Sequence, residues 1–209
     1  VYTAFMAYNA LDVKYNYDFS QTVPDTDEEM IYYNSFKKTF GEDGNVLAIG
    51  LKDSSVFLID KLKLYDNYIE EIQKVYGVKG VLGLSKLQVL KKNNLNKNFN
   101  FIDIFDPFPN DQQTYDSLLE VINNEKFYEG KILNDQGALT LLITIDKNIL
   151  NSESRNKLML DLIEKSEEFQ SESNIKLHYA GLPYSRYILA ESVKKELTRL
   201  LLFSIVVVA

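Results

Sequence analysis

The segment that most constrains this chain is its last stretch, residues 183–209, which has no helix breaker after Pro183. At 1.5 Å per residue, such a segment predicts a helix of about 40 Å. Charged residues occur along its first half as far as Arg199, and none follows from Leu200 onward. An apolar run of that kind is about half of the roughly 20 residues that cross a bilayer. We therefore interpret residues 183–209 as a helix leading into a truncated membrane span; the alternative is a buried core helix or strand.

The first ten residues have a similar character, because no charged residue precedes Asp12. No basic segment opens the chain, so a secretory signal peptide is a poor interpretation. We interpret residues 1–10 as the end of a membrane helix or its linker. Two apolar ends that flank a polar middle are typical of a domain that is looped out between two membrane spans.

The first half of the polar middle alternates between strand and helix patterns. Apolar and polar residues alternate over 11–19, which predicts a half-buried strand. A capping box at Thr26 predicts a helix that ends at Gly41. Further elements are a central strand over 46–51, a helix capped by Asp60 with a stripe of Leu62, Tyr65, Ile69, Ile72 and Tyr76, extended chain over 78–90, and a loop over Lys91–Asn100.

The second half repeats this order. The patterns predict a short extended piece over 101–109, a helix over 115–122, a strand over 138–145, a helix over 152–169 and a strand over 175–179. The predicted fold class is therefore α/β (α+β), with two β-α-β modules of about 11–100 and 101–182 whose helices pack on mixed sheets, plus the long C-terminal helix.

Composition excludes several classes of function. The net charge is -7 without a basic cluster, so we expect no nucleic-acid partner. The chain has no cysteine and a single histidine, His178, which we place on the polar face of a strand. We find no phosphate-binding glycine loop and no nucleophile motif, and we expect no catalytic residue, no metal site and no cofactor.

The order of these features resembles the region after the first membrane helix in resistance-nodulation-division (RND) exporters, in particular the MMPL-like branch. Members of that family leave the membrane into a strand, a turn with proline and a helix that ends in Phe-Gly. They then have a Gly-Val-x-x-Val segment and a Gly-x-Pro turn before the second membrane helix. The matching residues are 11–19, Val23-Pro24, Phe40-Gly41, Gly77-Val78 with Val81, and Gly181-Leu182-Pro183.

The resemblance implies a proton-driven exporter of the bacterial inner membrane, with residues 11–182 as a porter domain of ferredoxin-like architecture that faces the periplasm. It implies a hydrophobic or lipid-like substrate and a homo-oligomeric full-length protein. The proton-relay residues of the family lie in membrane helices outside this segment. The helix from Pro183 through Ser192 to Arg199 would couple movement in the membrane to the porter domain, and we expect its continuity to be necessary for transport.

The candidates for substrate contact are four aromatic residues in one proline-containing stretch, Phe99, Phe101, Phe105 and Phe108. They either close the core between the two modules or line an apolar path for the substrate. The pattern does not choose between these roles.

Other functions remain open at this point. A ligand-sensing domain of a membrane receptor would also lie between two spans, as would a substrate-facing domain of an ABC-type export permease. A soluble enzyme is a third possibility, which the lack of a polar constellation disfavours.

Overall fold

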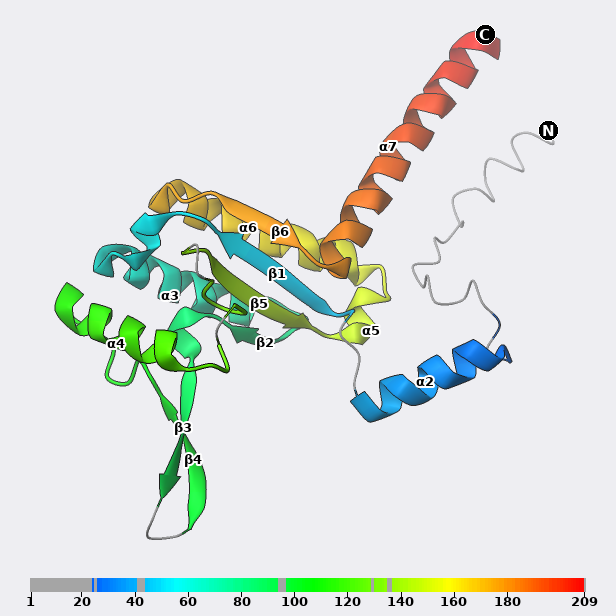
Figure 1. Ribbon diagram of the computed structural model, residues 1–209. Helices are drawn as coiled ribbons and strands as arrows, with labels where there is room; N and C mark the ends of the chain where they lie inside the picture. The colour runs from blue at the N-terminus through cyan, green and yellow to red at the C-terminus, as the bar shows by residue number, and fades with distance from the viewer. Residues whose placement is uncertain are drawn as a thin grey trace.

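We describe a computed structural model of the chain over residues 24, 26–40, 44–93, 97–128, 130–134 and 137–208 (Figure 1). The predicted strand over 11–19 and the predicted linker over 1–10 lie outside these residues. The strands are β1 (Val46–Leu51), β2 (Val78–Leu82), β3 (Gln88–Asn93), β4 (Asn98–Asp103), β5 (Leu139–Ile145) and β6 (Leu177–Ala180). The helices are α2 (Glu28–Phe40), η2 (Ser54–Phe57), α3 (Ile59–Lys74), η3 (Leu84–Lys86), α4 (Gln112–Asn124), α5 (Lys147–Leu150), α6 (Ser154–Ser173) and α7 (Leu182–Val208).

The main sheet has four strands in the order β2-β5-β1-β6. Each half of the chain contributes a β-α-β unit, β1-α3-β2 and β5-α6-β6, and a strand of the other unit lies between the two strands of each. This strand order is the split β-α-β arrangement of ferredoxin-like domains. The α+β class and the long C-terminal helix are thus confirmed.

The structure corrects the expectation of mixed sheets. Every neighbouring pair is antiparallel, in the main sheet and in the separate β3-β4 hairpin. The crossover helix α3 makes β1 and β2 parallel to each other, but β5 inserts between them and pairs antiparallel with both. The two units therefore share one sheet and one core.

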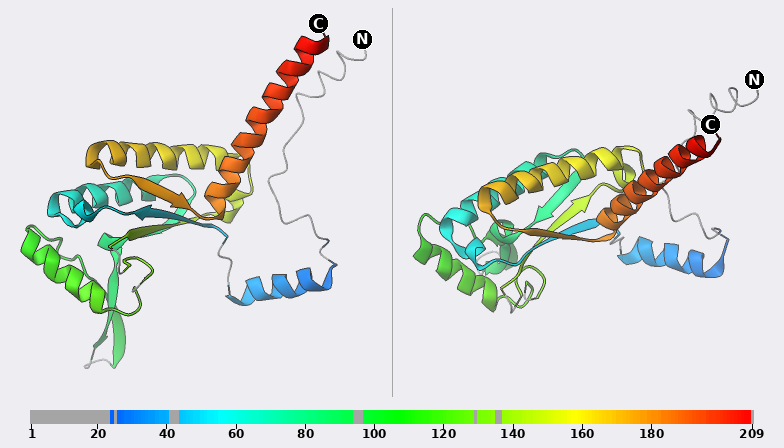
Figure 2. Two further views of the ribbon diagram at one scale, coloured as in Figure 1. Left: turned by 45° about the horizontal axis from the view of Figure 1, so that its top comes forward. Right: turned by 90° about the horizontal axis from the view of Figure 1, so that it is seen from above.

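Helices α3 and α6 pack against each other and cover one face of this sheet (Figure 2). The burial of β5 alternates strictly, so that Leu139, Leu141, Ile143 and Ile145 point into the core. The intervening residues, such as Thr140, are only half buried. Coverage of one face is common for antiparallel sheets and explains the period of two that the sequence shows.

Two details of α3 differ from the sequence-based expectation. The helix begins at Ile59, so Asp60 lies inside the first turn, and the N–H of Ile59 donates instead to the side-chain oxygen of Gln112 in α4 at 2.9 Å. The helix also ends before Gly77, which has a φ of 97°. Tyr76 therefore leaves the apolar stripe and is 76% exposed, whereas the other members of the stripe are buried.

The segment over Lys91–Asn100 was predicted as a loop, and this is wrong. It lies in the β3-β4 hairpin, whose register runs from Gln88 opposite Asp103 to Asn93 opposite Asn98. All residues of β4 are exposed. Asn98 to Phe101 do alternate between polar and aromatic residues, but the Asn- and Lys-rich composition around them is typical of a loop and hides this strand signal.

Three tyrosines, Tyr65, Tyr68 and Tyr115, are buried in the core. Burial raises the pKa of each phenol above its ordinary value. The hydroxyl of Tyr68 lies 2.7 Å from Ser166 Oγ. All three phenols therefore stay protonated in the folded state at a pH at which the unfolded chain would ionise them.

This difference predicts unfolding at alkaline pH. The stabilising effect is complete below the unfolded pKa of about 10 and is lost as the pH rises above it, because only the unfolded chain releases these protons. Each tyrosine contributes a slope of up to about 1.4 kcal/mol per pH unit. Urea unfolding between about pH 9 and about pH 11 should show a steadily falling free energy of unfolding. A constant value would contradict the burial of the three phenols.

Candidate functional site

The base of α7 is joined to the sheet by a turn that only glycine fits. Gly181 has a φ of 108°, which side chains with a Cβ rarely adopt. A Cβ at this position would lie 2.5 Å from the carbonyl oxygen of Val46 in β1. The first hydrogen bond of the helix runs from the N–H of Ser185 to the carbonyl oxygen of Gly181 at 3.1 Å. The Gly-x-Pro turn thus fixes the start of α7 against β1.

Aromatic packing adds to this joint. The rings of Tyr179 in β6 and Tyr184 in α7 stack with centroids 5.0 Å apart. Pro183 is buried and occupies the first turn of the helix, where its missing N–H costs no intrahelical hydrogen bond. The helix contacts β1, β6 and α6 through this first part.

Beyond its base, α7 projects from the body of the domain (Figure 1). Ser192 and Arg199 are exposed, and the helix continues through both without interruption. Apolar side chains after Arg199, such as Phe203 at 68% and Val207 at 84%, are exposed too. No helix among the described residues combines the length and the apolarity needed to cross a bilayer.

The structure separates the four aromatic candidates into two pairs. Phe105 is buried, and its ring centroid lies 6.3 Å from that of the half-buried Phe108 and 6.2 Å from that of Tyr115. Phe99 and Phe101 lie instead on the β3-β4 hairpin and are 62% and 71% exposed. The first pair therefore packs in the domain, and the second points into solvent.

A pocket of about 580 Å³ lies between α4, the end of η2 and the segment that leads into β5. Its lining is mostly apolar and consists of Phe57, Leu119, Ile122, Tyr128 and Leu133, with Gly137 and the amides Asn123 and Asn134. Pockets of about 300–1,000 Å³ with mainly apolar walls and a few polar groups are typical of small-molecule sites. This one is the best candidate for a ligand site within the described part of the chain.

Local hydrogen bonds hold the walls of this pocket. The side-chain oxygen of Asn134 accepts from the N–H of Ala138 at 2.8 Å and closes the turn before β5. The hydroxyl of Tyr128 donates to the carbonyl oxygen of Gln88 at 2.6 Å. Sequence reasoning missed the pocket, although Leu119 and Ile122 share one face of the predicted helix. The opposite walls come from distant segments, for which no local pattern gives a signal.

A second, more polar pocket of about 300 Å³ is bordered by Lys86, Gln88, Asp103, Phe105 and Asp106, among others. Lys86 Nζ lies 3.0 Å from a carboxylate oxygen of Asp66, and the side-chain amide of Gln88 donates to Asp103 at 2.7 Å. Lys86, Gln88 and Asp103 are therefore already paired.

Three carboxylates with a lowered pKa lie at helix starts, and a further one, Glu71, bonds to Lys74 near the end of α3. Asp53, Asp111 and Asp146 cap η2, α4 and α5, and each accepts a backbone N–H at 2.8 Å. That hydrogen bond is the main reason why the pKa of each carboxyl is lowered. These shifts are explained by helix capping.

His178 is exposed in β6, opposite Gly50 of β1. Within the described ranges, no group of three or more His, Cys, Asp or Glu side chains could hold a metal ion. The chain matches no protein-family model, and no curated protein is significantly similar to it. The resemblance to RND exporters therefore stays a prediction.

Proposed function

We propose that this chain is the extracytoplasmic substrate-handling domain of a proton-driven, RND-type exporter of hydrophobic or lipid-like compounds. In this proposal the domain faces the periplasm, the full-length protein resides in the bacterial inner membrane as a homo-oligomer, and the domain itself is not catalytic. The ferredoxin-like strand order is compatible with the porter architecture that the resemblance implies.

The observation that carries the proposal is the apolar pocket in a domain that ends in α7. The pocket walls are aliphatic and aromatic, which suits a hydrophobic compound, and the amide groups of the pocket can hydrogen-bond to a polar end of that compound. Helix α7 supports attachment to the membrane, because it is fixed at Gly181 and ends in exposed apolar side chains. A helix of this kind can transmit movement between a bilayer and the pocket-bearing domain.

We expect the pocket to bind an uncharged apolar dye such as N-phenyl-1-naphthylamine, and the Leu119→Asp variant to bind it at least about tenfold more weakly, because the carboxylate makes the wall polar. Dye fluorescence titrations measure both affinities. Leu119 is half buried in the pocket wall, so thermal unfolding should be recorded alongside to confirm that the variant is folded.

The matched control is Val121→Asp, which places the same charge on an exposed position of α4 outside the pocket. Both variants retain the apolar end of α7, so dye that binds there contributes equally. Equal affinities for the two folded variants would show that the pocket does not bind the dye, and the proposed substrate-handling role would then lose its basis.

A further inference from the structure

The β3-β4 hairpin carries an apolar face that is largely exposed. Leu90 lies directly opposite Phe101, and Lys92 opposite Phe99. Directly opposed residues point to the same side of an antiparallel pair, so these four side chains share one face, here named the hairpin surface. Its apolar members are more than half exposed, Leu90 at 54% and the two phenylalanines still more.

The hairpin carries positive charge as well. Lys92 lies on the hairpin surface, Lys97 is exposed next to β4, and Lys91 is exposed on the opposite side of the strand pair. The one acid in β3 and β4, Asp103, accepts a hydrogen bond from the Gln88 side chain at the base of the hairpin. The hairpin is thus locally basic, although the whole chain has a net charge of -7. An anionic partner matches this distribution of charge.

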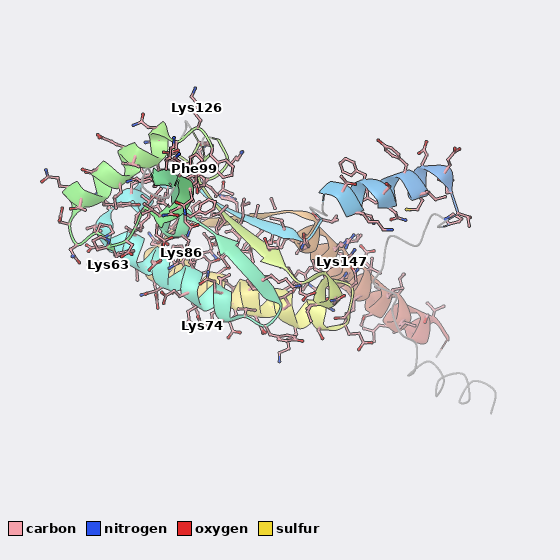
Figure 3. The ribbon with its side chains drawn as sticks, turned by 90° about the horizontal axis from the view of Figure 1, so that it is seen from below. Lys63, Lys74, Lys86, Phe99, Lys126 and Lys147 are labelled. Carbon is pink, nitrogen blue, oxygen red and sulfur yellow. The ribbon has the colours of Figure 1, made fainter. Side chains whose placement is uncertain are left out.

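A turn that neighbours the base of the hairpin also carries an exposed aromatic side chain and a lysine. The hydroxyl of Tyr128 bonds to both backbone groups of Gln88, at 2.6 and 3.2 Å, and fixes the turn to the base of the hairpin. Next to it, Phe127 is 67% exposed, and Lys131 Nζ lies 4.6 Å from the centre of its ring. Figure 3 looks at the hairpin from below and labels Phe99 in the hairpin and Lys126 close to the end of α4.

We propose that the hairpin surface docks on an anionic lipid bilayer. Aromatic and aliphatic side chains enter the boundary between headgroups and acyl chains, while lysines attract anionic headgroups. A small polar anion would engage the lysines alone and leave the exposed Leu90, Phe99 and Phe101 in water, whereas an anionic bilayer contacts both kinds of side chain. The inference does not depend on the proposed exporter function.

The hairpin and the apolar end of α7 point away from each other (Figure 1). The hairpin surface would therefore contact a lipid surface other than the one that α7 enters. The two apolar regions can also be tested separately, because they lie at opposite ends of the domain.

A dye attached near the hairpin surface tests this docking directly. The chain has no cysteine, so Asn98→Cys gives a unique site for an environment-sensitive nitrobenzoxadiazole label. Asn98 adjoins Phe99 in β4 but points to the other side of the strand, so the label is attached through a flexible linker that can follow the hairpin surface into the lipid headgroups. We expect its emission to shift to the blue and brighten with phosphatidylcholine vesicles that contain about one third phosphatidylglycerol. Vesicles of phosphatidylcholine alone should have little effect, and about 1 M salt should remove the signal.

Two double variants assign the signal to the hairpin. The double variant Phe99→Ser, Phe101→Ser should abolish the shift. The double variant Lys91→Gln, Lys92→Gln should raise the lipid concentration at half-saturation about thirtyfold, at roughly a factor of five per lysine. All four side chains are exposed, so circular dichroism should show an unchanged fold.

Two controls exclude binding through α7. A nitrobenzoxadiazole label at Glu172→Cys, which is exposed on α6, should keep the dim, unshifted emission of a label in water with all vesicles. Labelled Asn98→Cys should keep its response when Leu201 and Phe203 in α7 are replaced by serine. The proposal would be overturned if the protein co-floated with anionic vesicles in a density gradient while the emission of the label at Asn98 stayed unchanged. It would also be overturned if the emission shift were equally large with neutral vesicles, or if the Lys91→Gln, Lys92→Gln variant showed the same lipid dependence as the unmodified hairpin.

Discussion

Replacing Gly181 by alanine should lower the free energy of unfolding by about 3 kcal/mol or more. Alanine strongly disfavours the φ of 108° that the turn requires. Its Cβ would also lie 2.5 Å from the carbonyl oxygen of Val46, and neither backbone segment can move without disturbing the start of α7 or strand β1. Urea unfolding of the wild type and the variant measures the difference.

The matched control is Gly80→Ala in β2. A Cβ at Gly80 would meet no atom within 4 Å, and this glycine is not among those with positive φ. We expect its free energy of unfolding to stay within about 1 kcal/mol of the wild type. If Gly181→Ala were no more destabilising than Gly80→Ala, the turn would not be the rigid joint described above.

Local patterns predicted the elements of the main sheet well. The helices α3 and α6 follow the period of 3.6 in their apolar residues, β5 largely follows the period of two, and β1 is a continuous apolar run typical of a central strand. Each of these elements buries apolar side chains in the same core. The pairing of strands is different. Alternation shows which residues face the core, but not that β5 inserts between β1 and β2, so the two predicted modules turned out to share one sheet.

The candidate sites were less predictable because they depend on contacts between distant segments. The aromatic residues from Phe99 to Phe108 form one stretch in the sequence, yet the hairpin carries Phe99 and Phe101 outward while Phe105 packs on Tyr115. The pocket joins α4 to η2, two elements far apart in the chain. The Gly-x-Pro turn was visible in the sequence, but the reason for Gly181 is the nearby carbonyl group of Val46.

If the domain belongs to an exporter, as proposed above, breaking α7 should abolish export by the full-length protein. The helix is fixed at its base and exposed from Ser192 to Arg199, so its continuity depends on its own backbone hydrogen bonds. Proline at Lys195 removes one of these bonds and clashes with the preceding turn, at a cost of about 3 kcal/mol. The kink would uncouple movement of the apolar end of α7 from movement of the domain at Gly181.

The control is Lys195→Ala, which removes the same exposed charge and keeps the helix, since alanine has the best helix propensity. Both variants keep the number of residues in α7. The most direct test is the rate of apolar dye efflux from cells, normalised to the amount of full-length protein in the membrane. We predict efflux near background for Lys195→Pro and near wild type for Lys195→Ala. Wild-type efflux by Lys195→Pro at equal expression would contradict the role of α7 as the coupling helix of an exporter.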